Sequence, residues 1–141
     1  VQRSKGGKGT LYVFSDPLCQ HCQEFEPELD RLAKDYTIYL FPVSVIGGEA
    51  SRQHASLVLC LEKTGQRLAQ WKDAVQDIRE EGLRCSDGGA AVAANDQFFR
   101  VMRFAGTPAI INAAGEQVPD TIPNTAAAID QWMSGRAIAQ K

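Results

Sequence analysis

Apolar side chains follow two different spacings in the first third of the chain. Residues 10–15 form an almost continuous run of apolar, β-prone side chains, which is typical of a strand buried on both faces. Residues 37–41 form a second run, and Pro42 ends it. Between them, apolar side chains recur at three- and four-residue steps from Cys19 onward, which predicts an amphipathic helix kinked at Pro27. This part is therefore expected to be a strand–helix–strand unit.

The middle of the chain carries helical patterns only. We predict helices over residues 49–63, 66–78 and 90–104, with a polar turn region at 80–89 before the last of them. These helices would form an insertion, about residues 49–104, between the two strand-containing parts of the chain.

The last part returns to strand-like patterns and ends in a helix. Residues 109–112 predict a short strand, and residues 116–118 predict its antiparallel return after a turn. Asn124 or Thr125 then caps a final helix that Gly135 ends. The complete order predicts an α/β fold, with a central mixed sheet flanked by helices and an all-helical insertion between its two halves.

Composition and charge narrow the classes of function. A chain of 141 residues is expected to form one domain with its own core. Its 44% hydrophobic and 23% charged residues are ordinary for a globular protein. The net charge of -2 lacks the basic surplus of a nucleic-acid-binding protein. No apolar run approaches the roughly 18 residues of a membrane span.

The first residues differ from the rest in being polar and rich in glycine. We expect residues 1–9 to be a linker or a flexible end, and residues 10–141 to be the folded domain. The sequence begins at Val1 without a methionine and shows no signal peptide. We therefore expect the true N-terminus to lie upstream of Val1.

Two cysteines, Cys19 and Cys22, lie at the junction of the first predicted strand and helix. Thiol–disulfide exchange needs a thiolate, and the start of a helix favours an anion through its unpaired N–H groups and its dipole. Cys22 lies one turn further on, where it can resolve a mixed disulfide. His21 lies between them and can stabilise the Cys19 thiolate further. The pattern therefore indicates a redox-active pair.

The chain has two further cysteines, Cys60 and Cys85. Four cysteines allow three pairings, of which local geometry favours Cys19–Cys22 and so leaves Cys60–Cys85. A second, non-catalytic disulfide would indicate an oxidising compartment, because cytosolic reductants keep such thiols reduced.

Other chemistries use the same two-cysteine spacing. A zinc site needs two further ligands with similar spacing, whereas Cys60 and Cys85 stand alone and far apart. A haem attachment site needs a histidine directly after Cys22, and Gln23 stands there. A purely structural Cys19–Cys22 bridge stays open as an alternative. We expect neither a metal nor a cofactor.

Three features together resemble the thioredoxin superfamily. They are the sequence Cys19-Gln20-His21-Cys22, Pro27 five residues after the second cysteine, and Gly106-Thr107-Pro108 before the predicted hairpin. The resemblance implies a thioredoxin fold in which a proline-containing helix carries the redox pair. It also implies that the peptide bond before Pro108 is cis and that this proline packs beside the two sulfurs.

Within that superfamily, the chain looks most like the catalytic domain of periplasmic thiol:disulfide interchange proteins of the DsbC/DsbG type. Residues 13–19 resemble their approach to the active site, and residues 106–111 with 115–119 resemble their cis-proline loop and hairpin. Cys60 and Cys85 fall where that family has a structural disulfide. The resemblance covers nearly the whole chain and implies a location in the bacterial periplasm.

The resemblance implies a role for each residue of the site. Cys19 is expected to be the nucleophile, Cys22 the resolving thiol, and His21 the residue that tunes the Cys19 thiolate. Thr107 and Pro108 are expected to bind the substrate peptide. His21 is similar to its counterpart in DsbA-type oxidases, whereas Thr107 before the proline is similar to the isomerases.

These roles imply an enzyme, a protein thiol–disulfide oxidoreductase that acts as a disulfide isomerase or reductase. A DsbA-like thiol oxidase is one alternative, and a thioredoxin-fold chaperone or assembly factor of a secretion or conjugation system is another. The implied partners are secreted or periplasmic substrate proteins and a membrane thiol reductant of the DsbD type. Isomerases of this kind dimerise through an N-terminal domain, so the full-length protein is expected to be a homodimer through a domain missing here.

Overall fold

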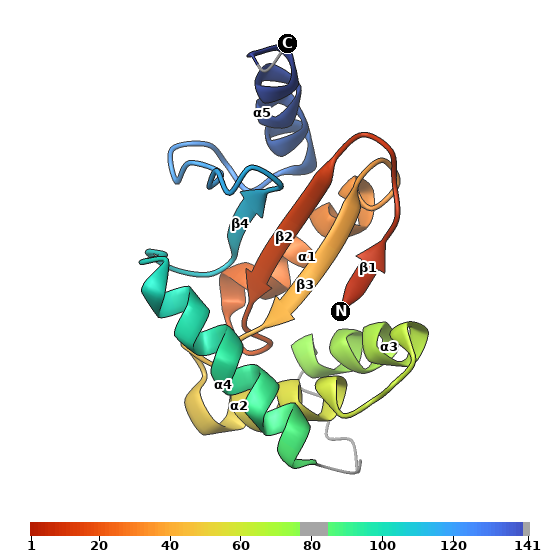
Figure 1. The fold of residues 1–141 in the computed structure, drawn as a ribbon, viewed down its shortest axis with the longest axis vertical. Coiled ribbons are helices and arrows are strands. Elements are labelled where there is room, and N and C mark those ends of the chain that lie inside the picture. The colour runs from red at the N-terminus through yellow and green to blue at the C-terminus, as the bar shows by residue number, and fades with distance from the viewer. Residues whose placement is uncertain (77–84, 140–141) are drawn as a thin grey trace.

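A four-stranded mixed sheet forms the centre of the structure (Figure 1). The structure is a computed structural model that describes residues 1–76 and 85–139, with side chains through residue 136. The strands lie in the order β1-β3-β2-β4. Strand β2 (Thr10–Ser15) pairs in parallel with β3 (Thr37–Pro42) and antiparallel with β4 (Ala109–Asn112). The two predicted central strands and the mixed character of the sheet are confirmed.

The first residues of the chain form an edge strand and not the expected flexible end. Strand β1 (Gln2–Ser4) pairs antiparallel with β3. The buried Arg3 guanidinium donates to Glu26 at 2.8 Å and to Asp30 at 2.9 Å. Glu26 also accepts a hydrogen bond at 3.1 Å from the indole of Trp71. Local sequence pattern missed this strand, because its partners lie more than twenty residues away.

Helix α1 (Gln20–Leu32) covers one face of the sheet, as Figure 1 shows. Its buried stripe packs against alternate residues of the two central strands, so the observed spacing of apolar residues explains both elements. The stripe consists of Cys22, Phe25, Leu29 and Leu32. The last helix, α5 (Ala126–Ala139), reaches the same core through Ile129.

Helix α5 differs from its prediction at its end. The amide of Ala128 donates to the Thr125 hydroxyl at 3.2 Å, so Thr125 caps the helix as expected. The helix nevertheless continues past Gly135, where a stop was predicted. An isolated glycine costs a helix only about 1 kcal/mol relative to alanine, so it does not force an end.

Within the described residues, three helices lie between β3 and β4, as predicted, and they gather near the ends of β2 and β3 (Figure 1). They are α2 (Gly48–Leu59), α3 (Thr64–Val75) and α4 (Ser86–Val101). None of the helices in the described ranges has the length and apolar character of a membrane span.

Helix α4 begins four residues before its predicted start, so the predicted turn region is wrong from Ser86 onward. Residues 80–84 of that turn, and the last two residues of the predicted 66–78 helix, lie outside the described residues. The Gly88 amide donates to the sulfur of the N-cap residue, Cys85, at 3.2 Å. A side chain at Gly88 would lie 2.4 Å from Cys60 Sγ. This glycine therefore serves close packing on a disulfide and not a turn, which the sequence pattern did not reveal.

A disulfide joins Cys60, after the end of α2, to Cys85 at the start of α4. The two residues are 25 positions apart, and their Cα atoms lie 5.8 Å apart. The bond thus links two helices of the insertion that also pack on each other.

Removing this disulfide is expected to lower the free energy of unfolding. In the chain-entropy model, a loop of this length contributes about 3.5 kcal/mol. Urea denaturation of the double variant Cys60→Ser, Cys85→Ser against the unaltered protein measures the difference. Mass spectrometry of the unreduced protein is the control, and free thiols at both positions would contradict the bond.

The predicted return after β4 is present as an antiparallel bridge, shorter than a full strand. Ile111 bridges to Gln117, and the Val118 amide donates to the Ile110 carbonyl at 2.9 Å. Gly115 in the turn has a φ of 80°, a left-handed conformation that favours glycine.

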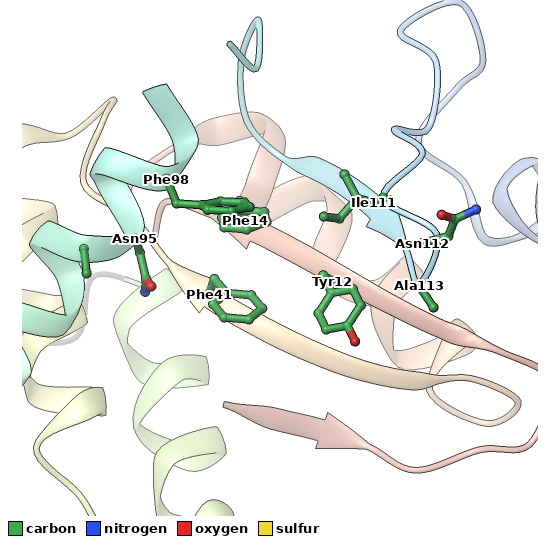
Figure 2. Close-up of a pocket in the computed structure, with 10 residues that line it drawn as sticks. Tyr12, Phe14, Phe41, Asn95, Phe98, Ile111, Asn112 and Ala113 are labelled. Carbon is green, nitrogen blue, oxygen red and sulfur yellow. The ribbon is translucent and has the colours of Figure 1, made fainter. Parts of the chain in front are cut away.

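Aromatic rings line the sheet face opposite α1 (Figure 2). Phe98 of α4 stacks on Phe14 with ring centroids 5.3 Å apart, and Phe14 stacks on Phe41 at 5.0 Å. With Tyr12 and Ile111 these rings line a pocket of about 440 Å³. The lining residues belong neither to the Cys19–Cys22 stretch nor to the loop before β4, so the pocket is separate from the cysteine pair.

Candidate redox site

The cysteine pair lies at the N-terminus of α1. Cys19 is the N-cap residue, with an extended backbone, and its amide donates to the Asp16 carbonyl at 3.2 Å. The first turn of the helix holds no acidic residue that would oppose an anion there. Cys19 is 5% exposed and Cys22 is fully buried, and both carry free thiols in this structure. Only Cys19 is therefore within reach of another molecule.

The loop before β4 brings a second segment to Cys19. The Thr107 hydroxyl donates to Cys19 Sγ at 3.0 Å, across 88 residues of sequence. The Thr107 carbonyl lies 3.8 Å from the same sulfur. The Thr107–Pro108 peptide bond is cis, as the resemblance implied.

Burial strongly affects the pKa of the second cysteine, Cys22. Loss of solvent contact raises the pKa of the Cys22 thiol to about 12. The nearby hydroxyls of Ser15 and Thr107 and the backbone of Asp16 lower the pKa of this thiol, and the neighbouring Cys19 adds to the rise. Cys22 is therefore a protonated thiol at neutral pH in the reduced pair.

His21 points away from the centre of the site. Its side chain is 80% exposed, and its Nδ1 atom lies 3.9 Å from a carboxylate oxygen of Glu24. No hydrogen bond joins it to Cys19 in the part of the chain that the structure describes. No hydrogen bond within the described residues therefore supports the expected role of His21 in tuning the Cys19 thiolate.

The buried carboxyl group of Asp16 anchors the loop that leads from β2 to Cys19. One oxygen accepts from the Leu18 amide at 2.9 Å and from the Ser51 hydroxyl at 2.5 Å. The other accepts from the amides of Ile46 and Gly47 at 2.8 and 3.0 Å. Asp16 therefore joins the cysteine loop to the start of α2.

The fold and this geometry agree with a comparison against known families. The model of the thioredoxin-like domain matches residues 1–133. The chain belongs to the thioredoxin-like domain family. No curated protein matches the sequence of this thioredoxin-like domain.

Several solved structures share the thioredoxin-like fold. A disulfide interchange protein from Neisseria gonorrhoeae has a TM-score of 0.64 and 22% identity, over 84% of this chain and 82% of that chain. Proteus mirabilis ScsC in a transitional conformation has a TM-score of 0.72 and 22% identity, over 98% of this chain and 71% of that chain. Helicobacter pylori DsbG has a TM-score of 0.64 and 19% identity, over 79% of this chain and 54% of that chain.

The thioredoxin-like fold brings together Cys19, Cys22 and Thr107, and it leaves His21 at the rim. Sequence reasoning missed Asp16 and Ser15. A signal for Asp16 was available, because a charged residue directly after a strand buried on both faces needs buried partners. Among the residues described, no group of three or more His, Cys, Asp or Glu side chains is arranged to hold a metal ion.

Proposed function

We propose that this protein is a thiol–disulfide oxidoreductase that exchanges disulfides with polypeptide substrates. One observation carries the proposal: Cys19 Sγ lies at a helix N-terminus, accepts a hydrogen bond from Thr107 at 3.0 Å, and has a buried second thiol one turn away. A helix N-terminus and a hydroxyl donor both stabilise negative charge on sulfur, which is what an attacking or leaving thiolate needs.

The reaction would proceed in two exchanges. The Cys19 thiolate attacks one sulfur of a substrate disulfide, forms a mixed disulfide, and releases the other substrate sulfur as a thiolate that takes up a proton. Cys22 then loses its proton and attacks Cys19 Sγ, which forms the Cys19–Cys22 disulfide and releases the second substrate thiolate. Two electrons pass from the cysteine pair to the substrate. Oxidation of a substrate dithiol is the reverse sequence.

The residues around Cys19 would bind the substrate. Thr107 would offer backbone groups beside the sulfur, and Pro108 would contact the peptide next to Thr107. An extended peptide next to this loop would place its disulfide against Cys19.

We propose that the protein reduces and isomerises the disulfides of its substrates, so that electrons flow from the cysteine pair to the substrate. Thr107 before Pro108 and the overall resemblance to the DsbC/DsbG type support it. The exposed position of His21 supports it as well, because the histidine makes no described hydrogen bond to Cys19 that would favour the thiolate of an oxidase.

We further propose that the protein acts outside the cytoplasm of a bacterium. The Cys60–Cys85 disulfide supports an oxidising compartment. The similar solved structures include a periplasmic thioredoxin-like protein from Salmonella enterica. Secreted proteins would be the substrates, and a membrane thiol reductant of the DsbD type would return electrons to the pair.

The proposal is tested by mixing the reduced protein with a disulfide-bonded substrate protein. We expect the substrate to gain free thiols while the Cys19–Cys22 pair loses two hydrogens, as mass spectrometry of alkylated samples shows. A pair that stays reduced beside an oxidised substrate would contradict the proposed function. Equilibration with glutathione gives the reduction potential, and a value near that of DsbA, about -120 mV, would favour the thiol oxidase.

A further inference from the structure

One buried hydroxyl group near the cysteine pair has no partner. Ser15, the last residue of β2, is 1% exposed, and its Oγ atom makes no hydrogen bond within the part of the chain that the structure describes. Buried polar atoms are nearly always paired, so an unpaired hydroxyl next to a reactive group calls for an explanation.

The position of Ser15 in the strand directs it toward the redox helix. Side chains alternate along a strand, so Ser15 shares a face with Leu11 and Val13, which pack in the core with α1. Cys22 is the first residue of the buried stripe of α1. The Ser15 side chain and the Cys22 side chain therefore lie on the same side of the sheet, at the end of β2 and the start of α1.

The electrostatic surroundings of Cys22 agree with this placement. Burial has the largest effect on the pKa of Cys22 and raises it, and the Ser15 side chain comes first among the groups that lower it. Thr107 also contributes, but its hydroxyl carries one proton and donates it to Cys19 Sγ at 3.0 Å. Because Thr107 donates its proton to Cys19, the Ser15 hydroxyl is the one of these two that can donate a hydrogen bond to Cys22 Sγ.

We propose that the Ser15 hydroxyl donates a hydrogen bond to Cys22 Sγ when that sulfur carries negative charge, and that it thereby speeds closure of the Cys19–Cys22 disulfide. The inference rests on the proposed function. In the closing step, Cys22 loses its proton to the solvent, and its sulfur bonds to Cys19 Sγ. The bond from Cys19 to the substrate sulfur breaks, and the substrate sulfur leaves as a thiolate that takes up a proton. The Ser15 proton stays on its oxygen throughout. In the reverse direction the same hydrogen bond stabilises Cys22 as the leaving thiolate.

A chromogenic disulfide reagent separates the attack by Cys19 from the closure of the disulfide by Cys22, because each step releases one chromophore. The reduced protein is mixed with 5,5′-dithiobis(2-nitrobenzoate) in a stopped-flow spectrometer. The first thionitrobenzoate is released when Cys19 attacks, at a rate that depends on reagent concentration. The second is released when Cys22 closes the disulfide, at a rate that does not.

In Ser15→Ala and Ser15→Val we expect the second release to slow about tenfold, the factor for losing one hydrogen bond to a charged group. The first release should change less than about twofold, because Cys19 keeps its bond from Thr107. Ser15→Thr, which has the shape of valine but keeps the hydroxyl, should restore the second release to within about threefold of the unaltered protein.

The control variant is Ser56→Ala, which removes a buried hydroxyl on α2 and should alter neither release. Closure in Ser15→Ala as fast as in the unaltered protein would overturn the inference, and so would closure in Ser15→Thr as slow as in Ser15→Val. If Ser15→Val does not fold, the alanine and threonine variants decide. Failure of the unaltered protein to give any second release would instead contradict the proposed function itself.

Discussion

Replacing Cys19 by serine is expected to abolish disulfide exchange and to leave the fold intact. Cys19 is the slightly exposed residue of the pair, and Cys22 is fully buried, so no other thiol of the pair can start the reaction. A serine hydroxyl stays protonated at neutral pH and cannot form the mixed disulfide. We expect the rate of substrate disulfide reduction to fall on the order of a thousandfold or more, to the background level.

The matched control for this variant is Cys22→Ser. It keeps the attacking sulfur but cannot close the disulfide, so the mixed disulfide with substrate should accumulate on non-reducing gels. Serine is close to cysteine in size, and thermal unfolding should show both variants folded. Full biological activity of Cys19→Ser would contradict the oxidoreductase and would favour the alternative of a thioredoxin-fold chaperone or assembly factor.

Replacing Asp16 by alanine is expected to cause the largest loss of stability among the substitutions near the site. Its fully buried carboxyl accepts four hydrogen bonds, from the cysteine loop, from the loop before α2 and from α2 itself. Removal leaves three backbone amides and one hydroxyl without that acceptor. Unsatisfied buried donors cost about 1 to 3 kcal/mol each, so we expect the free energy of unfolding to fall by about 3 to 5 kcal/mol after relaxation.

Urea denaturation measures this loss, and two further variants grade it. Ser51→Ala removes one of the four donors and should cost only about 1 kcal/mol. Asp16→Asn keeps one of the two oxygens as an acceptor and should fall between the other two variants. A loss below about 1 kcal/mol for Asp16→Ala would show that Asp16 does not hold the loop.

Local sequence pattern was sufficient for the elements that position the cysteine pair. Residues 10–15 and the stripe that begins at Cys22 have the two- and three-to-four-residue periods of a strand and a helix, and the structure has both. These periods arise from contacts between neighbours along the chain and from burial of one face, so a single sequence reveals them. The resemblance to the thioredoxin superfamily implied that Cys19 and Thr107 belong to one site, and the structure brings the two side chains together.

Contacts between distant residues decided the rest. Strand β1 pairs with β3, and its Arg3 forms ion pairs with Glu26 and Asp30. Helix α4 begins at Ser86, where Gly88 packs on the Cys60–Cys85 disulfide. A short polar or glycine-containing segment carries no periodic signal, so its neighbours across the fold determine its structure.

The cysteine pair shows the same division. The sequence by itself determined that two thiols lie one turn apart at a helix start, since this follows from spacing alone. Only the tertiary structure decided their surroundings: it places the Thr107 hydroxyl on Cys19, buries Cys22, and leaves His21 in solvent. The chemistry of a thiol depends on burial and on nearby donors, and both are set by residues far away in the chain.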